Sequence, residues 1–167
     1  LGFAYLIGGD YESAFGLEKN SEESQRWFEL SAKQGNVDSM YELGKNLLDY
    51  DSGFKIDTEK GEHYLQQAAE KGKSDACYEL YRLHRWTKHD AQKALFWAER
   101  AVENGNTFLI HDIAELYFNG EGTAIDYEKA AEYYRRCIKD DLEDINSNLS
   151  YLPLAKCCLL FSHPTDK

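Results

Sequence analysis

Three short stretches of the chain carry residue types that could do chemistry. The stretch SGFK, from Ser52 to Lys55, has the S-x-x-K spacing that places a lysine beside a nucleophilic serine in some acyl-transfer enzymes. Such sites need further motifs, and neither S-D-N nor K-T-G occurs elsewhere in the sequence. We therefore predict that the chain has no catalytic residue and is not an enzyme.

The other two stretches contain potential metal ligands. HRWTKH offers His84 and His89, but a spacing of five residues puts the two imidazoles on different faces of a helix. The acidic run DDLED, from Asp140 to Asp144, lacks the alternating ligands and the central glycine of an EF-hand loop. We predict that His84 is a packing residue and that the DDLED stretch is a solvated acidic insertion. We therefore predict that the chain binds neither a metal nor a cofactor.

The elements that would position these stretches form an internal repeat. WFELSAKQGN at Trp27 returns as YLQQAAEKGK at Tyr64 and as WAERAVENGN at Trp97. Each copy follows a residue able to cap a helix N-terminus and ends on a glycine able to adopt the left-handed conformation. A fourth copy has the cap and the aromatic residue but carries Asp141 at the glycine position. The caps are Asn20, Asp57, Asp90 and Asp126, the aromatic residues are Trp27, Tyr64, Trp97 and Tyr133, and the glycines are Gly35, Gly72 and Gly105.

A second helix is predicted before each of these. It is marked by an apolar residue followed in most copies by a small one, as in Leu43-Gly44, and the mark lies eight residues after the preceding repeat glycine three times. This constancy predicts a rigid corner between hairpins, whereas the turn inside each hairpin varies in length. The sequence predicts one repeat domain over residues 1–167, with units at about 1–36, 37–73, 74–106 and 107–142 and a terminal helix at about 150–161.

One hairpin cannot bury its own apolar face, but a stack of hairpins can, because each unit covers its neighbour. Small residues in both helices should let the backbones approach closely, and the repeat aromatics should fill the space between units. The repeat aromatics are 33 to 37 residues apart, which suits a helix–turn–helix repeat. We therefore predict an all-α, right-handed α/α solenoid.

The composition narrows the class of partner. Thirty acidic against nineteen basic residues give a net charge of −11, which disfavours nucleic acid and favours solubility. No run of about 18 apolar residues is present, so no membrane insertion is predicted. The four cysteines are irregularly spaced, which fits packed thiols, although a bridge from Cys137 to Cys157 stays open.

The stretch IAELYFNGEGTAIDYEKAAEYYRRCIKDD, from Ile113 to Asp141, closely resembles a Sel-one-like repeat, a subclass of the tetratricopeptide-like superfamily. Tyr117 and Tyr133 fall on repeat positions of that family, and the resemblance extends from Leu1 to about Phe161. The second and third units depart from the family pattern because they lack its G-x-G turn. In the third unit, a shorter turn, HRWTKHD, stands in its place.

The resemblance implies a non-catalytic adaptor that binds a protein or peptide on a concave surface lined by the first helices. Carried onto this sequence, that surface is a row of residues at i, i+4 and i+7: Tyr41, Lys45 and Leu48; Tyr78, Arg82 and Arg85; His111, Glu115 and Phe118. Two alternatives stay open, an inhibitor or immunity-type protein that masks a basic effector and an enzyme or small-ligand receptor using the same groove. The irregular cysteine spacing favours a cytoplasmic protein. Because the chain opens on Leu1, as a fragment would, a periplasmic or secreted protein also stays possible.

Overall fold

In a computed structural model of the protein, the backbone is described for residues 20–141 and the side chains for residues 20–137. Every regular element in this range is helical, and no strand occurs in it. The predicted first helix at Leu1-Gly2, the terminal helix at 150–161 and the possible partner Cys157 lie outside the described residues. The chain divides into two compact units between Leu80 and Tyr81, and each is described by itself.

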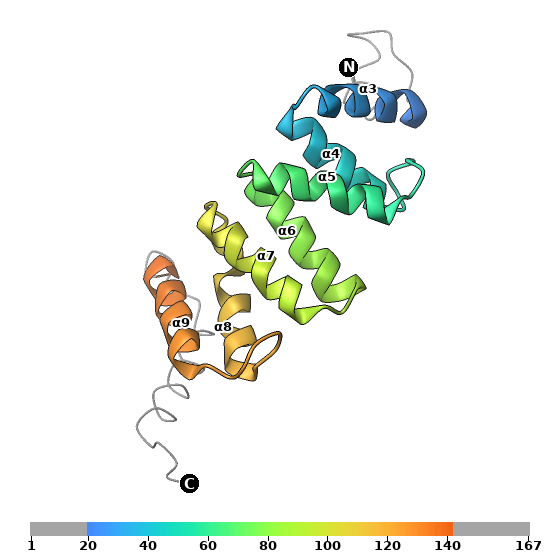
Figure 1. The fold of residues 1–167 in the computed structure, drawn as a ribbon. Helices are drawn as coiled ribbons and strands as arrows, with labels where there is room; N and C mark the ends of the chain where they lie inside the picture. Colours follow the sequence, from blue (N-terminus) through green and yellow to red (C-terminus); the bar gives the residue numbers. More distant parts are fainter. Residues whose placement is uncertain (1–19, 142–167) are drawn as a thin grey trace, which may run out of the picture. The chain divides into compact units, whose positions relative to one another are not determined.

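The first unit contains the helices α3 (Ser21–Lys33), α4 (Val37–Leu48) and α5 (Thr58–Glu70), followed by most of α6 (Ser74–Arg82). Helix α3 packs against α4, and α4 packs against α5 (Figure 1). Neighbours in sequence are therefore neighbours in space, as expected for successive hairpins.

The second unit begins in the last turn of α6 and continues as the π-helical segment η1 (Leu83–Thr87). Helix α7 (Ala91–Glu103), the 3₁₀ segment η2 (Thr107–Leu109), α8 (Ile110–Asn119) and α9 (Tyr127–Asp141) follow. Helix α8 packs against both α7 and α9. Within the described part of the chain, no helix is both long enough and apolar enough to cross a bilayer.

All four predicted caps start their helices. The Oδ1 atom of each cap accepts a hydrogen bond from the backbone N–H three residues on. These bonds are Glu23 to Asn20 at 3.0 Å, Lys60 to Asp57 at 3.0 Å, Lys93 to Asp90 at 3.1 Å and Lys129 to Asp126 at 3.0 Å.

The predicted corners are also the same in each copy. The backbone φ angles are +88° at Gly35, +86° at Gly72 and +94° at Gly105, which is the left-handed region that glycine enters cheaply. The residue after each glycine donates its N–H to a carbonyl five residues back, for example from Asn36 to Ser31 at 3.3 Å and from Lys73 to Ala68 at 3.0 Å. This bond closes the last turn of the helix and fixes the direction of the next one.

Helices α4 and α5 meet at glycines, as the small residues in the repeat predict. A Cβ atom added to Gly44 would lie 2.9 Å from the carbonyl oxygen of Gly61 and 2.7 Å from Cγ of Leu65. Leu43, Leu47 and Leu65 are fully buried around this contact. The two backbones can therefore come this close only because neither position carries a side chain.

Two expectations need correction. The stretch HRWTKHD was predicted to be a turn, but helix α6 continues as η1 to Thr87. The wide π turn, closed by a bond from Lys88 N–H to the Leu83 carbonyl at 2.9 Å, lets Leu83 and His84 both face the core. His84 is fully buried, as expected for a packing residue, and His89 is exposed.

The repeat aromatics also differ more than the repeat suggests. Trp97 is buried, whereas Trp27, Tyr64 and Tyr133 are only half-buried. Tyr133 stacks on Tyr117 with ring centres 6.0 Å apart. The aromatic position thus helps to cover each hairpin but does not form a uniform buried layer, because its burial depends on which neighbouring side chains reach it.

Candidate functional site

A row of residues was predicted on the first helix of each hairpin, and equivalent positions of this row have the same exposure in three successive repeats. Its first position is half-buried in each unit, its second position is exposed in each, and its third position is half-buried in each. In that order the positions hold Tyr41, Tyr78 and His111, then Lys45, Arg82 and Glu115, then Leu48, Arg85 and Phe118. We call these nine residues the first-helix row.

In α4, the row is part of a small cationic and aromatic cluster. The Nζ atoms of Lys45 and Lys73 lie 5.9 Å and 5.4 Å from the centre of the Tyr41 ring. Lys73 also donates to Asp38 at 2.8 Å, and this bond raises the pKa of Lys73. The Tyr41 ring therefore interacts with two lysine ammonium groups of the chain itself.

In α6 and η1, the two arginines of the row are in different states. Arg82 is exposed, whereas Arg85 is half-buried and forms an ion pair with Glu121. That hydrogen bond raises the pKa of Arg85, whose guanidinium also lies 5.3 Å from the ring centre of the exposed Trp86. Arg82 is therefore more accessible to a partner than Arg85.

In α8, two members of the row pack against α9. The ring of His111 meets Tyr134 at 5.7 Å between centres, and the ring of Phe118 meets Tyr127 at 5.4 Å. Glu115 remains exposed between them. The row therefore offers partly covered rings on both sides of an exposed carboxylate.

Side chains on α8 also form a cluster that sequence reasoning missed. Ligand atoms of His111, Asp112 and Glu115 all lie within 4.8 Å of one another, a set that could hold a divalent cation. Asp112 already accepts a hydrogen bond from the Tyr81 hydroxyl at 2.9 Å. In the sequence, the only signal of this cluster is the i, i+1 and i+4 spacing of the three residues, which places them close together on one helix.

The serine of the SGFK stretch is occupied in shaping a turn. Its hydroxyl oxygen lies 2.7 Å from the carbonyl oxygens of both Asn46 and Asp49. It also accepts the N–H of Phe54 at 3.1 Å, and the Phe54 side chain is buried. Ser52 therefore holds the connection between α4 and α5, while Lys55 is exposed.

Tyr117, a repeat tyrosine on α8, forms a structural polar contact and not a binding site. Tyr117 donates its hydroxyl to Glu99 at 2.7 Å, and Lys129 lies 4.8 Å from the Tyr117 ring centre. Burial, together with the bond to Glu99, raises the pKa of Tyr117, so the hydroxyl stays protonated and keeps donating. This contact ties α7, α8 and α9 together.

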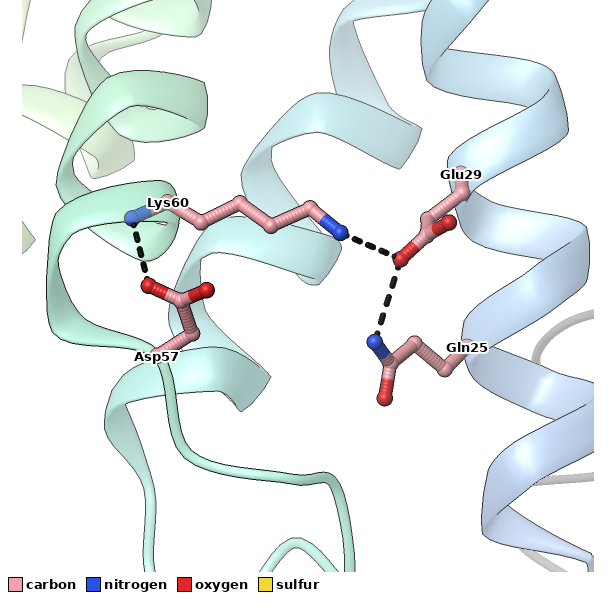
Figure 2. A network of polar contacts seen from close by, with 4 residues as sticks. All are labelled: Gln25, Glu29, Asp57 and Lys60. Atoms are coloured by element: carbon pink, nitrogen blue, oxygen red, sulfur yellow. Dashed lines mark hydrogen bonds and ion pairs between the residues drawn. The ribbon is translucent and has the colours of Figure 1, made fainter.

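A second polar network joins α3 to α5 and was not predicted (Figure 2). Lys60 extends from the first turn of α5 and donates to Glu29 Oε1 at 2.6 Å, and Gln25 donates to the same oxygen at 3.0 Å. Burial raises the pKa of Glu29, but these two hydrogen bonds, together with the charges of Lys60 and Lys33, outweigh it and the pKa is lowered. The carboxylate therefore stays charged and positions the ammonium group of Lys60.

Capped helical hairpins joined by glycine corners define an all-α helical solenoid protein. The family model for the Sel1 repeat matches residues 2–36, 37–73, 74–106 and 110–138, which is most of the chain. The chain belongs to the Sel1 repeat family, and the resemblance found in the sequence is confirmed.

Two solved structures support the fold. A Sel1 repeat protein from Oxalobacter formigenes is 25% identical, with a TM-score of 0.67, and the match covers 93% of this chain and 59% of that one. A protective antigen of uropathogenic Escherichia coli strains, which displays an SLR fold, is 22% identical with a TM-score of 0.63, covering 81% of this chain and 30% of that one. The chain therefore spans only part of the length of both proteins. No curated protein sequence matches it closely enough to count as a relative.

Membership of the family has a functional meaning at a coarse level. Sel1 repeats generally mediate protein–protein interactions, and Sel1 repeat proteins are typically non-catalytic scaffolds. Which surface and which partner apply to this chain are separate questions, because function lies in sites that a fold only carries.

Proposed function

We propose that this chain is a non-catalytic interaction module that binds a protein or peptide partner through the first-helix row. The observation that carries the proposal is the repeated exposure pattern of the row, half-buried, exposed and half-buried in three successive units. A position that serves only packing would be buried, and one without a function could vary freely in exposure between units. In a helical-hairpin solenoid, the first helices line the concave side, where such proteins bind extended partners.

The residue types in the row support a binding role. Tyr41, Tyr78 and Arg82 are of the types enriched at binding hot spots, because they combine contact area with directional hydrogen bonds. The exposed positions carry Lys45, Arg82 and Glu115, so the row offers both basic and acidic side chains to charged groups of a partner.

The net charge of −11 supports a second candidate within the same class, an inhibitor or immunity-type protein that masks a basic effector. Long-range attraction to a basic partner would make association fast and strongly dependent on salt. Association through the first-helix row alone would depend on salt less strongly, because its exposed charges, from Lys45, Arg82 and Glu115, are few and of both signs.

Affinity capture with a charge-reversal variant tests the first-helix row. Arg82→Glu should reduce recovery of a specific partner from an extract of the source cells by about tenfold, measured by quantitative mass spectrometry against the unmodified chain. Arg135→Glu is the matched control, because Arg135 is exposed on the second helix α9 and the charge change is the same. The control should retain the partner.

Other outcomes separate the alternatives. If both variants retain every partner, the first-helix row is not the binding surface. If the partners persist but Arg82→Glu abolishes binding of a small molecule, the groove serves a small-ligand receptor or an enzyme. If recovery rises equally in both variants, each of which makes the chain more negative, and disappears at high salt, the chain binds a basic partner through its overall charge.

A further inference from the structure

We propose that the compact unit that contains α3, α4 and α5 carries a second binding site. The site is a pocket between α3 and α5, and it binds an acidic peptide segment that bears an apolar side chain. The pocket has a volume of about 450 Å³. Its described lining residues come from the second helices α3 and α5, from the corner at Gly35 and from Met40 of α4, and none of them belongs to the first-helix row. The inference does not depend on the proposed function of that row.

The walls of the pocket come from elements that the repeat places side by side. Lys60, His63, Tyr64 and Gln67 line it from α5, and their i, i+3, i+4 and i+7 spacing puts them on one helix face. The last turn of α3 contributes Lys33. The corner that begins at Gly35 turns the chain away here, which leaves the end of α3 open to solvent.

The charged side chains that line the pocket are basic, whereas the chain as a whole is acidic. Lys33, Lys60 and His63 line it, and none of the lining residues in the described part of the chain is an aspartate or a glutamate. Lys33 is exposed and forms no ion pair within residues 20–137, although its charge acts on the Glu29 carboxylate four residues before it. In a chain with net charge −11, a recess whose described lining residues are all basic or neutral favours an anionic ligand.

The second lysine is held at the rim by the network in Figure 2. Lys60 reaches toward α3 and meets Glu29, which is not one of the lining residues. Its ammonium group has three donors, and the bond to Glu29 uses one of them. A ligand carboxylate can therefore share Lys60 with Glu29, although Glu29 repels it.

The pocket also has an apolar side. Met40 lines it and is only 5% exposed, and the half-buried ring of Tyr64 lies on the face of α5. Methionine is flexible and polarizable, so it adapts to side chains of different shape. His63 and Gln67 contact each other at 2.9 Å and add a polar edge. An apolar side chain would therefore lie on Met40 and Tyr64 while a neighbouring carboxylate meets Lys33.

Fluorescence anisotropy with short labelled peptides tests the proposal. The probe is fluorescein-GDFDG, and the controls are GKFKG, GNFNG and GDGDG with the same label. Only a peptide with both carboxylates and the phenylalanine should bind well. Raising the salt concentration should weaken binding, because the contacts to Lys33 and Lys60 are near the surface.

Two variants should change affinity in opposite directions. Lys33→Glu should weaken binding of the GDFDG probe by about fivefold or more, and Glu29→Gln should strengthen it by about threefold, because the amide still accepts the two hydrogen bonds but no longer repels the ligand. Lys55→Glu is the matched control, since Lys55 is exposed and does not line the pocket. It should leave the affinity unchanged.

Several results would overturn the proposal. The first is that the GDFDG probe does not bind at a protein concentration of about 1 mM, which corresponds to negligible affinity. The second is equal binding of all four peptides, and the third is an equal loss in Lys33→Glu and Lys55→Glu. If Lys33→Glu instead abolishes self-association in sedimentation, the pocket holds a second copy of the chain and not a peptide. Arg82→Glu should not affect the probe, so the failure of one site is distinguishable from the failure of the other.

Discussion

Glu29 and Lys60 show at the scale of single residues how the repeat creates an interaction that neither unit contains alone. Lys60 is fixed at the start of α5 by the Asp57 cap, and Glu29 sits on the face of α3 that the hairpin brings next to it (Figure 2). Their bond lowers the pKa of Glu29, against the effect of burial, and raises the pKa of Lys60. The interaction therefore contributes to stability only within a range of pH.

The lowered pKa of Glu29 predicts the acid side of that range. Its contribution is present above the pKa of an unfolded glutamate and is lost as the pH falls through the lower pKa of the folded state. At pH 7 the chain should be more stable than Glu29→Gln by about 0.5–1 kcal/mol, and the two should converge as the pH falls below the pKa of an unfolded glutamate and through the lower pKa of the folded state. Urea unfolding followed by circular dichroism across this range measures the difference.

A matched control for this prediction is Glu70→Gln. Glu70 is exposed on the same helix as Lys60 and forms no ion pair with any residue between 20 and 137. Its substitution should change stability by less than about 0.5 kcal/mol. A gap between the chain and Glu29→Gln that stays constant down to pH 3 would show that the carboxylate charge is not what stabilises the contact.

At the scale of elements, the contact between α4 and α5 depends on the absence of side chains. Gly44 and Gly61 face each other's carbonyl oxygens, and a Cβ atom on either would lie 2.9 Å from the other's oxygen. A backbone atom at that distance cannot rotate away as the end of a side chain can. The glycines lower the helix propensity of both helices, and the close packing around Leu65 offsets that loss.

Gly44→Ala should therefore destabilise the chain, even though alanine is the better helix former. Helix propensity favours alanine by about 1 kcal/mol, but overpacking in a core costs about 1–3 kcal/mol, and a clash with a backbone oxygen belongs at the upper end of that range, so we expect a net loss of about 2 kcal/mol. Urea unfolding measures the change. Lys45→Ala, at the exposed neighbouring position, is the control and should change stability by less than about 0.5 kcal/mol. A more stable Gly44→Ala would show that α4 and α5 can separate without cost.

At the scale of the whole molecule, acidic residues outnumber basic ones by thirty to nineteen. The ion pairs of the described residues, such as Lys60 with Glu29 and Lys73 with Asp38, involve partly exposed side chains and contribute little each. Repulsion among the remaining carboxylates acts over the whole surface. It opposes folding until salt screens it.

Salt should consequently stabilise the fold. Raising sodium chloride from about 10 mM to about 0.5 M should raise the melting temperature by about 2–5 °C, because screening weakens the repulsion more than it weakens a few surface pairs. Differential scanning calorimetry measures this shift, and potassium chloride at equal ionic strength should act in the same way. A lower melting temperature at high salt would mean that ion pairs dominate.

The sequence predicted most of what depends on neighbours along the chain. The caps at Asn20, Asp57, Asp90 and Asp126 and the glycine corners act within about five residues of themselves, so their residue types suffice to place the helix ends. The Sel1 repeat, the all-α class and the meeting of small residues at Gly44 followed from the same register. The assignment of the first-helix row to binding remains a prediction.

Only the tertiary structure decided what depends on residues far apart in sequence. The pairing of Lys60 with Glu29 spans 31 positions and that of Arg85 with Glu121 spans 36, and no local pattern marks either. The π turn at His84 and the unequal burial of Trp97 and Tyr64 depend on how neighbouring side chains fill the space around them. Local hydrogen bonds fix where helices begin and end, but packing between helices selects which side chains meet, and that selection is made only when the chain folds.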